Sequence, residues 1–185
     1  MQTVIIDNTK EWTVEDYLSL EQTNKPCELI NGELVMSPAP SLIHQIILSN
    51  LNDVLKSYAK QTDAFTLFSP VDVFFDTRNV FQPDLFFIKK ENRSILSERG
   101  IEGAPDLVVE IISPSNSYKD RYEKKIAYQK FGVKEYWIID PGNKTLEIYT
   151  STQEDQDTPQ LYLAEEGLVT STVLPQLQFN LKEIF

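Results

Sequence analysis

A carboxylate stands in the middle of an apolar run in the segment Ala104–Ser113, which reads APDLVVEIIS. Such an uninterrupted apolar run is typical of a buried strand. Glu110 lies inside the run, and burying an ionised carboxylate is costly unless a cation, a metal or a set of hydrogen-bond donors meets it. We therefore expect Glu110 to have a partner of this kind.

A second carboxylate begins another apolar run, because Asp84 follows Pro83 and precedes Leu85–Ile88. Two strands lying side by side would bring Asp84 and Glu110 close together. Two converging carboxylates favour a divalent metal ion. On its own, a carboxylate after a proline is more often a turn or capping residue, so that alternative stays open for Asp84.

A lysine is predicted to face the same place from a helix over residues 118–131. At the helical period, Lys124 shares one sector with Asp120, Ala127, Tyr128 and Phe131. The apolar members of this sector should face a sheet, which makes Lys124 the inward lysine and Lys125 the outward one. Lys124 would then either pair with Asp120 one turn earlier or reach over the strand end toward Asp84 and Glu110.

Helices and strands alternate through the rest of the chain. Strand-like runs occur at 28–36, where Asn31-Gly32 predicts a hairpin turn, and at 65–75, 84–88, 136–140, 145–149, 161–163 and 168–169. Helices are predicted after a Thr13 N-cap, over 41–60, over 118–131 between a Ser113–Ser117 cap and Gly132, and briefly over 180–185. Residues 89–103 should form a loop or a short surface helix, and 150–160 an acidic loop. The pattern predicts an α/β fold in which helices flank one mixed sheet.

Composition limits the class of protein. With 185 residues, 41% of them hydrophobic, the chain can bury a substantial core as a single domain over residues 1–185. No apolar run approaches the roughly 20 residues that a membrane helix needs, and the N-terminus lacks the features of a signal peptide, so a cytoplasmic location is expected. The single cysteine, Cys27, excludes an internal disulfide and is expected to be a small core residue.

The charge is unevenly distributed. The net charge of −11 argues against non-specific binding of nucleic acid by the whole surface. Residues 117–134, however, hold six basic and two acidic side chains. Four of these basic residues are candidates for contacts with phosphates that position a strand without reading its sequence: Lys119, Arg121, Lys125 and Lys130.

The order of these motifs resembles the PD-(D/E)XK nuclease superfamily and, within it, the Uma-two family of restriction-endonuclease-like bacterial proteins. The resemblance extends from about Cys27 to Pro141 and is carried by CELINGELVMSPAPSLIHQ, QPDLFFI and PDLVVEIISPSNSYKDRYEKKIAYQKFGVKEYWIIDP. It implies a restriction-endonuclease-like core in which Asp84 and Glu110 hold Mg²⁺ or Mn²⁺, with the Ile111 carbonyl as a further ligand.

One position departs from the superfamily pattern. Glu-x-Lys would put a lysine at position 112, where this chain has Ile112. The resemblance implies that the catalytic lysine has moved to the following helix, as Lys124, and that Glu28 is an additional acidic residue of the site. His44 lies in the SLIHQ string that recurs in the family, without an assigned role.

The function implied is that of a Mg²⁺-dependent endodeoxyribonuclease that hydrolyses phosphodiester bonds of DNA. Because cleavage of both strands usually takes two active sites, a homodimer is compatible with this activity. Two alternatives stay open. One is a catalytically silent interaction or regulatory module on the same fold, which the net charge favours; the other is an enzyme that hydrolyses a small phosphate ester with the same carboxylates.

Overall fold

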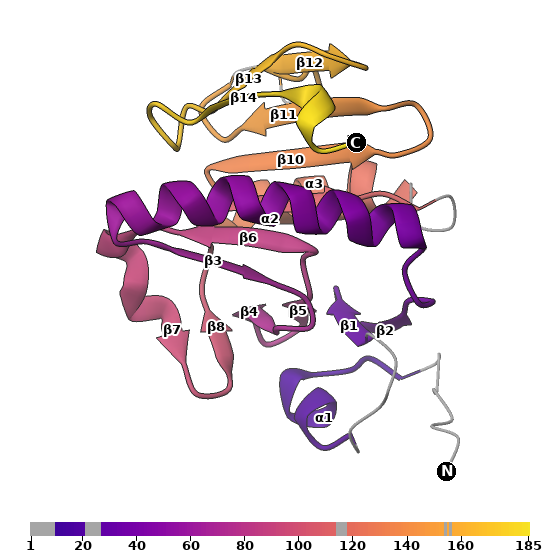
Figure 1. Cartoon of the computed structure of the whole chain (residues 1–185). Helices are drawn as coiled ribbons and strands as arrows, with labels where there is room; N and C mark the ends of the chain where they lie inside the picture. The colour runs from indigo at the N-terminus through magenta and orange to yellow at the C-terminus, as the bar shows by residue number, and fades with distance from the viewer. Residues whose placement is uncertain (1–9, 21–26, 114–117, 154, 156) are drawn as a thin grey trace.

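The fold consists of two larger β-sheets with helices packed on them (Figure 1). The structure, a computed structural model, describes residues 10–20, 27–113, 118–153, 155 and 157–185, without the side chain of Lys119. This arrangement confirms the predicted mixed α/β class with flanking helices. The strands divide between two six-stranded sheets and a two-stranded one within the described residues, where the sequence pattern predicted one mixed sheet.

The central sheet carries the strand built around Glu110. Its members are β3 (Phe65–Phe68), β6 (Leu85–Ile88), β9 (Leu107–Ile111), β10 (Glu135–Asp140), β11 (Thr145–Thr150) and β12 (Leu161–Ala164). Their order across the sheet is β12-β11-β10-β9-β6-β3. The pair β9 and β10 is parallel and the other pairs are antiparallel. The strands after Asp84 and around Glu110 are therefore direct neighbours, as predicted.

The second six-stranded sheet is built from short strands. Its members are β1 (Cys27–Ile30), β2 (Glu33–Met36), β4 (Val73–Asp76), β5 (Asn79–Phe81), β7 (Leu96–Ser97) and β8 (Gly100–Glu102), in the order β2-β1-β5-β4-β8-β7. The hairpin of β1 and β2 turns at Asn31 and Gly32, whose φ angles of 52° and 83° are those that a tight hairpin turn requires. The two-stranded sheet pairs β13 (Leu168–Thr170) with β14 (Gln178–Asn180).

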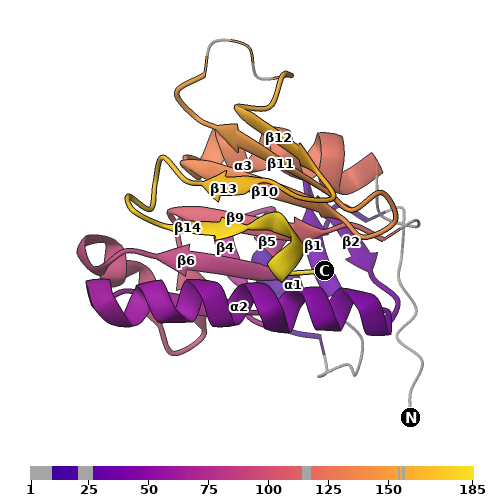
Figure 2. The same cartoon turned by 45° about the horizontal axis from the view of Figure 1, so that its top comes forward.

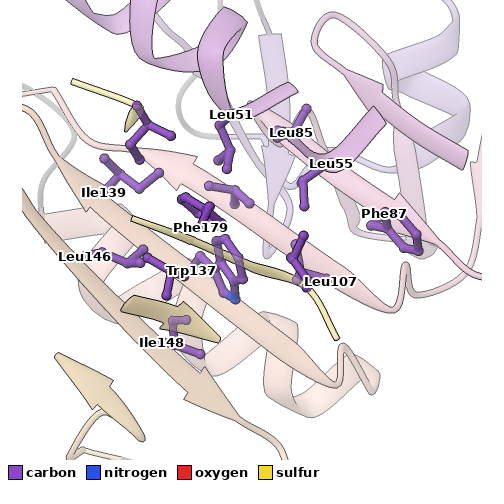
Figure 3. Packing of buried hydrophobic residues seen from close by; sticks show 14 of the residues in the cluster. Leu51, Leu55, Leu85, Phe87, Leu107, Trp137, Ile139, Leu146, Ile148 and Phe179 are labelled. Carbon is purple, nitrogen blue, oxygen red and sulfur yellow. The ribbon is translucent and has the colours of Figure 1, made fainter. Parts of the chain in front are cut away.

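Helices cover both faces of the central sheet. The long helix α2 (Leu42–Thr62) begins after its N-cap Ser41, runs beside β3 and β6 (Figures 1 and 2), and packs on the face that carries Leu85, Phe87, Leu107, Val109 and Trp137. Figure 3 shows Leu51 and Leu55 of α2 directed into this core. The opposite face, with Phe86, Val108 and Tyr136, is covered by α3 (Lys125–Phe131) and the π-helical turn η2 (Lys119–Lys124) that leads into it.

The alternation of side chains along β9 places Glu110 on the face covered by α3. Val109 and Ile111 lie in the core under α2, whereas Val108 and Ile112 pack on the α3 side. Successive residues of a strand point to opposite faces, so Glu110 shares the side of Val108. The carboxylate is thus directed toward the helix that was predicted to supply the lysine.

Short elements account for most differences from the predicted boundaries. The run 65–75 is split into β3 and β4, which belong to different sheets, because Pro70 between them has no N–H with which to continue a ladder. Residues 89–103 form a 3₁₀ turn, η1 (Lys90–Ile95), and the small hairpin of β7 and β8. This hairpin was missed because its strands of two and three residues are too short for periodicity to emerge.

The ends of the chain follow the predictions more closely. Thr13 caps α1 (Val14–Leu18) in a reciprocal capping box with Asp16. The predicted terminal helix is the short 3₁₀ turn η3 (Leu181–Glu183), and β14 before it was not predicted.

The proposed cap of the helix after β9 lies mostly outside the described residues, since these omit 114–117. Among the helices in the described part of the chain, none combines the length and apolar character needed to cross a membrane.

The segment between β13 and β14 is joined to the central sheet through a buried carboxylate. Glu135, with no exposed surface, accepts hydrogen bonds from the Trp137 Nε1–H at 2.6 Å, from the N–H and hydroxyl of Thr172 at 3.0 and 2.8 Å, and from the Val173 N–H at 3.1 Å. Four donors therefore meet one side chain, and the N–H of Val173 is shared with Oγ of Ser171 at 3.1 Å.

Replacing this carboxylate should destabilise the protein. We expect Glu135→Ala to lower the free energy of unfolding by about 3 kcal/mol, because it leaves buried donors without an acceptor. Urea unfolding followed by circular dichroism measures this change. The exposed Glu91→Ala serves as the control and should shift stability by less than about 0.5 kcal/mol. Equal effects of the two substitutions would show that Glu135 does not secure this segment.

Candidate active site

A cavity of about 780 Å³ opens where β1, β6 and β9 meet the start of α2 and the turn η2. The four residues named as catalytic from the sequence all line it: Glu28, Asp84, Glu110 and Lys124. They come from four different elements or their ends, spread over almost one hundred positions of the chain. The fold therefore brings together the set that the sequence predicted, while their chemical roles remain a proposal.

Lys124 lies between carboxylates at the floor of the cavity. Its Nζ is 2.9 Å from Oε1 of Glu28, 2.9 Å from Oε1 of Glu110 and 3.6 Å from Oδ1 of Asp120. Each of these four side chains is at most 7% exposed. We call Glu28, Glu110, Asp120 and Lys124 the acid–lysine cluster. Both partners expected for Lys124, the residue one turn earlier and the carboxylate of the strand, are thus present at once.

The protonation of the cluster is shaped by burial and by charge. Burial raises the pKa of Glu110 well above its usual range, and the neighbouring carboxylates add to this rise while Lys124 opposes it. Burial likewise raises the pKa of Asp120, to about 6. Burial lowers the pKa of Lys124, but Glu110, Glu28 and Asp120 outweigh it and hold the value well above the ordinary lysine range. Lys124 therefore carries its positive charge at neutral pH.

Backbone and tyrosine donors hold the carboxylates of the cluster in place. The hydroxyl of Tyr128, one turn after Lys124, donates to Oε1 of Glu110 at 2.7 Å. The N–H of Gln82, which follows β5, donates to Oε1 of Glu28 at 2.8 Å. Glu110 and Glu28 thus each meet a neutral donor as well as the lysine, which offsets part of the cost of burying them.

Asp84 sits beside the cluster and is held by two other groups. The N–H of Ile111 donates to its Oδ2 at 2.8 Å, and Nε2 of His44 lies 3.1 Å from the same oxygen. His44 is in the first turn of α2 and its side chain is only 9% exposed. Burial lowers the pKa of His44, but the hydrogen bond to Asp84 and the charge of Asp84 together outweigh this effect. The pKa of His44 is therefore above its ordinary value. Sequence reasoning had left His44 without a role.

The second Pro-Asp pair of the sequence, Pro105-Asp106, lies elsewhere. Asp106 is 1% exposed and accepts from the N–H of Lys89 at 2.8 Å and from Nζ of Lys134 at 2.6 Å. It does not line the cavity. The Pro-Asp pair by itself therefore could not distinguish Asp84, which lines the cavity, from Asp106, which does not.

The prediction that Lys125 points outward is wrong. Its side chain is 7% exposed, and its Nζ lies 4.6 Å from the ring centroid of Tyr149 and 3.5 Å from Oδ1 of Asp157. The physical reason is the π-helical turn over Lys119–Lys124, which holds more residues than an α-helical turn. After such a turn, the side chains face the sheet one position later than an α-helical period predicts. Lys125 is therefore buried together with Lys124.

Arg121 also has an internal partner in place of the phosphate contact expected of it. Its guanidinium pairs with Asp140 at 3.2 Å and with Glu147 at closer range, which joins η2 to the hairpin of β10 and β11. Lys130 is exposed, and the side chain of Lys119 lies outside the described residues. The basic segment is therefore mostly committed to contacts within the protein.

Some residues of the site were not singled out from the sequence. Asp120 appeared only as a pairing alternative, Tyr128 only as a sheet-facing residue, and Gln82 and Asp140 not at all, although all but Tyr128 line the cavity. A signal existed for Tyr128, which shares the inward sector of Lys124. Gln82 acts through its backbone, where side-chain type gives no signal.

The donors at the cavity floor fit a hard divalent cation. Within the described residues, no three His, Cys, Asp or Glu side chains are arranged to hold a metal by themselves. Asp84, Glu110 and the carbonyl of Ile111 offer the oxygen ligands that Mg²⁺ and Mn²⁺ prefer, and all three residues line the cavity. Mg²⁺ is commonly bound by one or two carboxylates together with waters and substrate phosphates. The donor set thus suits a cation shared with a phosphate, and does not suit a closed all-protein cage.

Among the solved structures that are similar to this chain is one that covers almost its whole length. It is the crystal structure of a protein from Anabaena variabilis ATCC 29413, described as "a putative nuclease belonging to DUF820". The two chains are 25% identical, with a TM-score of 0.77 over 94% of this chain and 97% of the other. Among curated proteins, no sequence matches this chain.

A family comparison agrees with the resemblance inferred from the motifs. The sequence model of the Uma2 family, described as "Putative restriction endonuclease", matches residues 14–182. The match spans both large sheets, the cavity and the acid–lysine cluster. This chain therefore belongs to the Uma2 family.

Proposed function

We propose that this chain is a metal-dependent nuclease that hydrolyses phosphodiester bonds of DNA. The observation that carries the proposal is the convergence of Asp84, Glu110 and the lysine-bearing turn in one cavity of a chain from a nuclease-like family. A structural role alone gives no reason for a cavity to open onto such a set.

Two carboxylates and a carbonyl would hold the cation. We assign Asp84, Glu110 and the carbonyl of Ile111 as ligands for Mg²⁺ or Mn²⁺. Bound there, the cation would lower the pKa of a water and offset the charge that develops on the phosphate. The N–H of Ile111 keeps Asp84 oriented, since it donates to Oδ2 at 2.8 Å.

Lys124 would act on the phosphate by its charge. In hydrolysis the water oxygen forms a bond to phosphorus, the bond from phosphorus to the leaving sugar oxygen breaks, and a proton passes to that oxygen. The raised pKa of Lys124 favours a fixed ammonium over a general base. Its positive charge can offset the negative charge that grows on the phosphate oxygens in the transition state.

Glu28 and Asp120 would position that ammonium. They contact Nζ of Lys124 from two elements, at 2.9 Å and 3.6 Å. Their burial keeps these contacts largely free of solvent screening. In this proposal Glu28, expected from the resemblance as an additional acidic residue of the site, acts by holding Lys124 in place and does not itself contact the substrate.

The silent-module alternative rests on charge. The chain carries a net charge of −11, and Lys124 already compensates the buried carboxylates without a metal. On that account the cluster is structural, and removing a carboxylate changes stability without any metal-linked effect. Metal binding separates the two functions.

Loss of a ligand should abolish metal binding. We expect the parent to bind Mn²⁺ in the presence of a thymidine dinucleotide, and Asp84→Asn and Glu110→Gln to weaken this binding by about 100-fold or more, because each removes a charged oxygen ligand. Isothermal titration calorimetry measures the affinity. Asp53→Asn, an exposed carboxylate of α2, should bind like the parent. No binding by the parent would contradict the nuclease proposal and favour the silent module.

Lys124 should affect turnover more than binding. We expect Lys124→Met to lower kcat for bis(p-nitrophenyl) phosphate in Mn²⁺ by about 100-fold. The reason is that the variant loses the positive charge that offsets the negative charge growing on the phosphate oxygens in the transition state. Its Mn²⁺ affinity should not fall, since a neighbouring positive charge has been removed. The exposed Lys130→Met is the control, and Lys124→Arg retains a charge if the methionine variant does not fold. An unchanged kcat in both Lys124 variants would rule out this role.

His44 would hold Asp84 in its ligating orientation. The imidazole and the N–H of Ile111 meet the same carboxylate oxygen, which restricts the rotation of the Asp84 side chain. Groups that orient a metal ligand in this way typically contribute 10–100-fold to metal affinity. His44 is therefore a positioning residue in the proposed site.

Removing the imidazole donor should weaken metal binding without unfolding the protein. We expect His44→Leu to raise the Kd for Mn²⁺ by about 10-fold or more, and His44→Gln, which retains an N–H donor, to recover much of the affinity. Calorimetry and thermal melting are to be measured together. Gln45→Leu, at the exposed neighbouring position, is the control. If His44→Leu binds Mn²⁺ like the parent, the residue does not position Asp84.

A further inference from the structure

The surface around the cavity carries little positive charge. The cavity is lined by five carboxylates, from Glu28, Asp84, Glu110, Asp120 and Asp140, and by one lysine, Lys124, among the described residues. That lysine is itself engaged by three of the carboxylates. Asp140 is likewise engaged, by Arg121, so the charged side chains that line the cavity are largely committed to one another.

Much of the basic segment over residues 117–134, which could have extended a phosphate-binding surface, is paired within the protein. Arg121 pairs with Asp140 and Glu147, Lys125 is buried against Tyr149, and Lys134 pairs with Asp106 at 2.6 Å. Duplex DNA carries one negative charge per roughly 1.7 Å of helix axis, and proteins that bind it neutralise several phosphates with Lys and Arg. The described surface beside the cavity offers no such row of basic side chains.

One side of the cavity rim is apolar. There the connection from β2 to α2 contributes Pro38, Ala39 and Pro40, and the first turn of α2 contributes Ile43, all exposed. Ile43 is 44% exposed, and Leu42 and Ile46 next to it on α2 are 78% and 41% exposed. Apolar side chains at a mouth of this kind match the faces of unpaired bases better than a sugar–phosphate backbone.

The reactive groups lie deep beneath this rim. Glu28, Glu110 and Lys124 are 5%, 3% and 5% exposed. A phosphodiester must enter the cavity to reach them, and a cavity of about 780 Å³ is of the size that encloses a small ligand. One or two nucleotides fit this class of site, whereas a base-paired strand stays bound to its complement outside.

From these observations we infer that the substrate is an unpaired DNA strand, whose nucleotides enter the cavity with their bases against the apolar rim at Pro38–Pro40 and Ile43. The inference rests on the proposed nuclease function and specifies its substrate class. A single strand has a lower charge density than a duplex, so it depends less on basic contacts and is repelled less by an acidic protein. Unpaired bases expose their faces without any cost of strand opening.

The test compares three substrates in Mn²⁺. These are a labelled single-stranded oligothymidine, an oligothymidine–oligoadenine duplex of the same length, and bis(p-nitrophenyl) phosphate. We expect kcat/KM for the single strand to exceed that for the duplex by about tenfold or more. Equal or faster cleavage of the duplex, with hydrolysis of the small diester, would overturn the strand preference and leave the nuclease function standing. No hydrolysis of any of the three would overturn both.

A rim variant tests where the bases lie. Ile43→Glu adds a negative charge and removes an apolar contact, so we expect kcat/KM for the single strand to fall by about tenfold. Ile126→Glu makes the same change at an apolar residue of α3 that is 62% exposed and does not line the cavity, and it should cleave the strand like the parent. Equal effects of the two substitutions would contradict a role of the rim in binding bases.

Discussion

The rest of the structure depends on one buried ammonium group among carboxylates. Without Lys124, three nearly inaccessible carboxylates would face one another, and their mutual repulsion in a poorly solvated interior would oppose folding. With it, the first strand of the hairpin, the central strand β9 and the turn η2 are linked at a single atom. The same ammonium is what a phosphate entering the cavity would meet. In the proposed function, one side chain thus both compensates buried carboxylates and acts on the phosphate.

The fold isolates this polar cluster from the apolar core that stabilises the protein. The face of the central sheet under α2 is apolar, with Leu51, Leu55, Leu85 and Trp137 fully buried, and each such side chain stabilises the fold by roughly 1.5–3 kcal/mol. The cluster lies on the opposite face, next to the π-helical turn. A second apolar cluster, with Phe86, Val108 and Tyr136, packs beside it on that face, so apolar burial on both faces can offset the cost of burying the charged groups.

The basic side chains of the protein are also used mainly for contacts within it. In this acidic protein, much of the basic segment forms internal ion pairs. Arg121 joins η2 to the hairpin of β10 and β11, and Lys134, just before β10, pairs with Asp106, just before β9. Of the residues in these pairs, Asp140 lines the cavity, and it also accepts from the N–H of Gly142 at 2.9 Å. A basic segment in a sequence therefore does not by itself indicate a surface that binds nucleic acid.

The sequence by itself determined the elements whose signals are local. The Asn31-Gly32 turn, the apolar periodicity of α2, the buried run around Glu110 and the inward sector of Lys124 all follow from residue type and spacing, and they were predicted correctly. The motif order also identified the family. Only the tertiary structure decided which carboxylates meet: Asp84 and Asp106 both follow proline, yet one lines the cavity and the other pairs with Lys134. It also decided that Lys125 is buried, that His44 reaches Asp84 and that the strands form two large sheets. The physical reason is that local patterns fix the conformation of a segment, whereas a partner's identity depends on contacts between residues far apart in the chain, and a single π-helical turn is enough to change which side chains face inward.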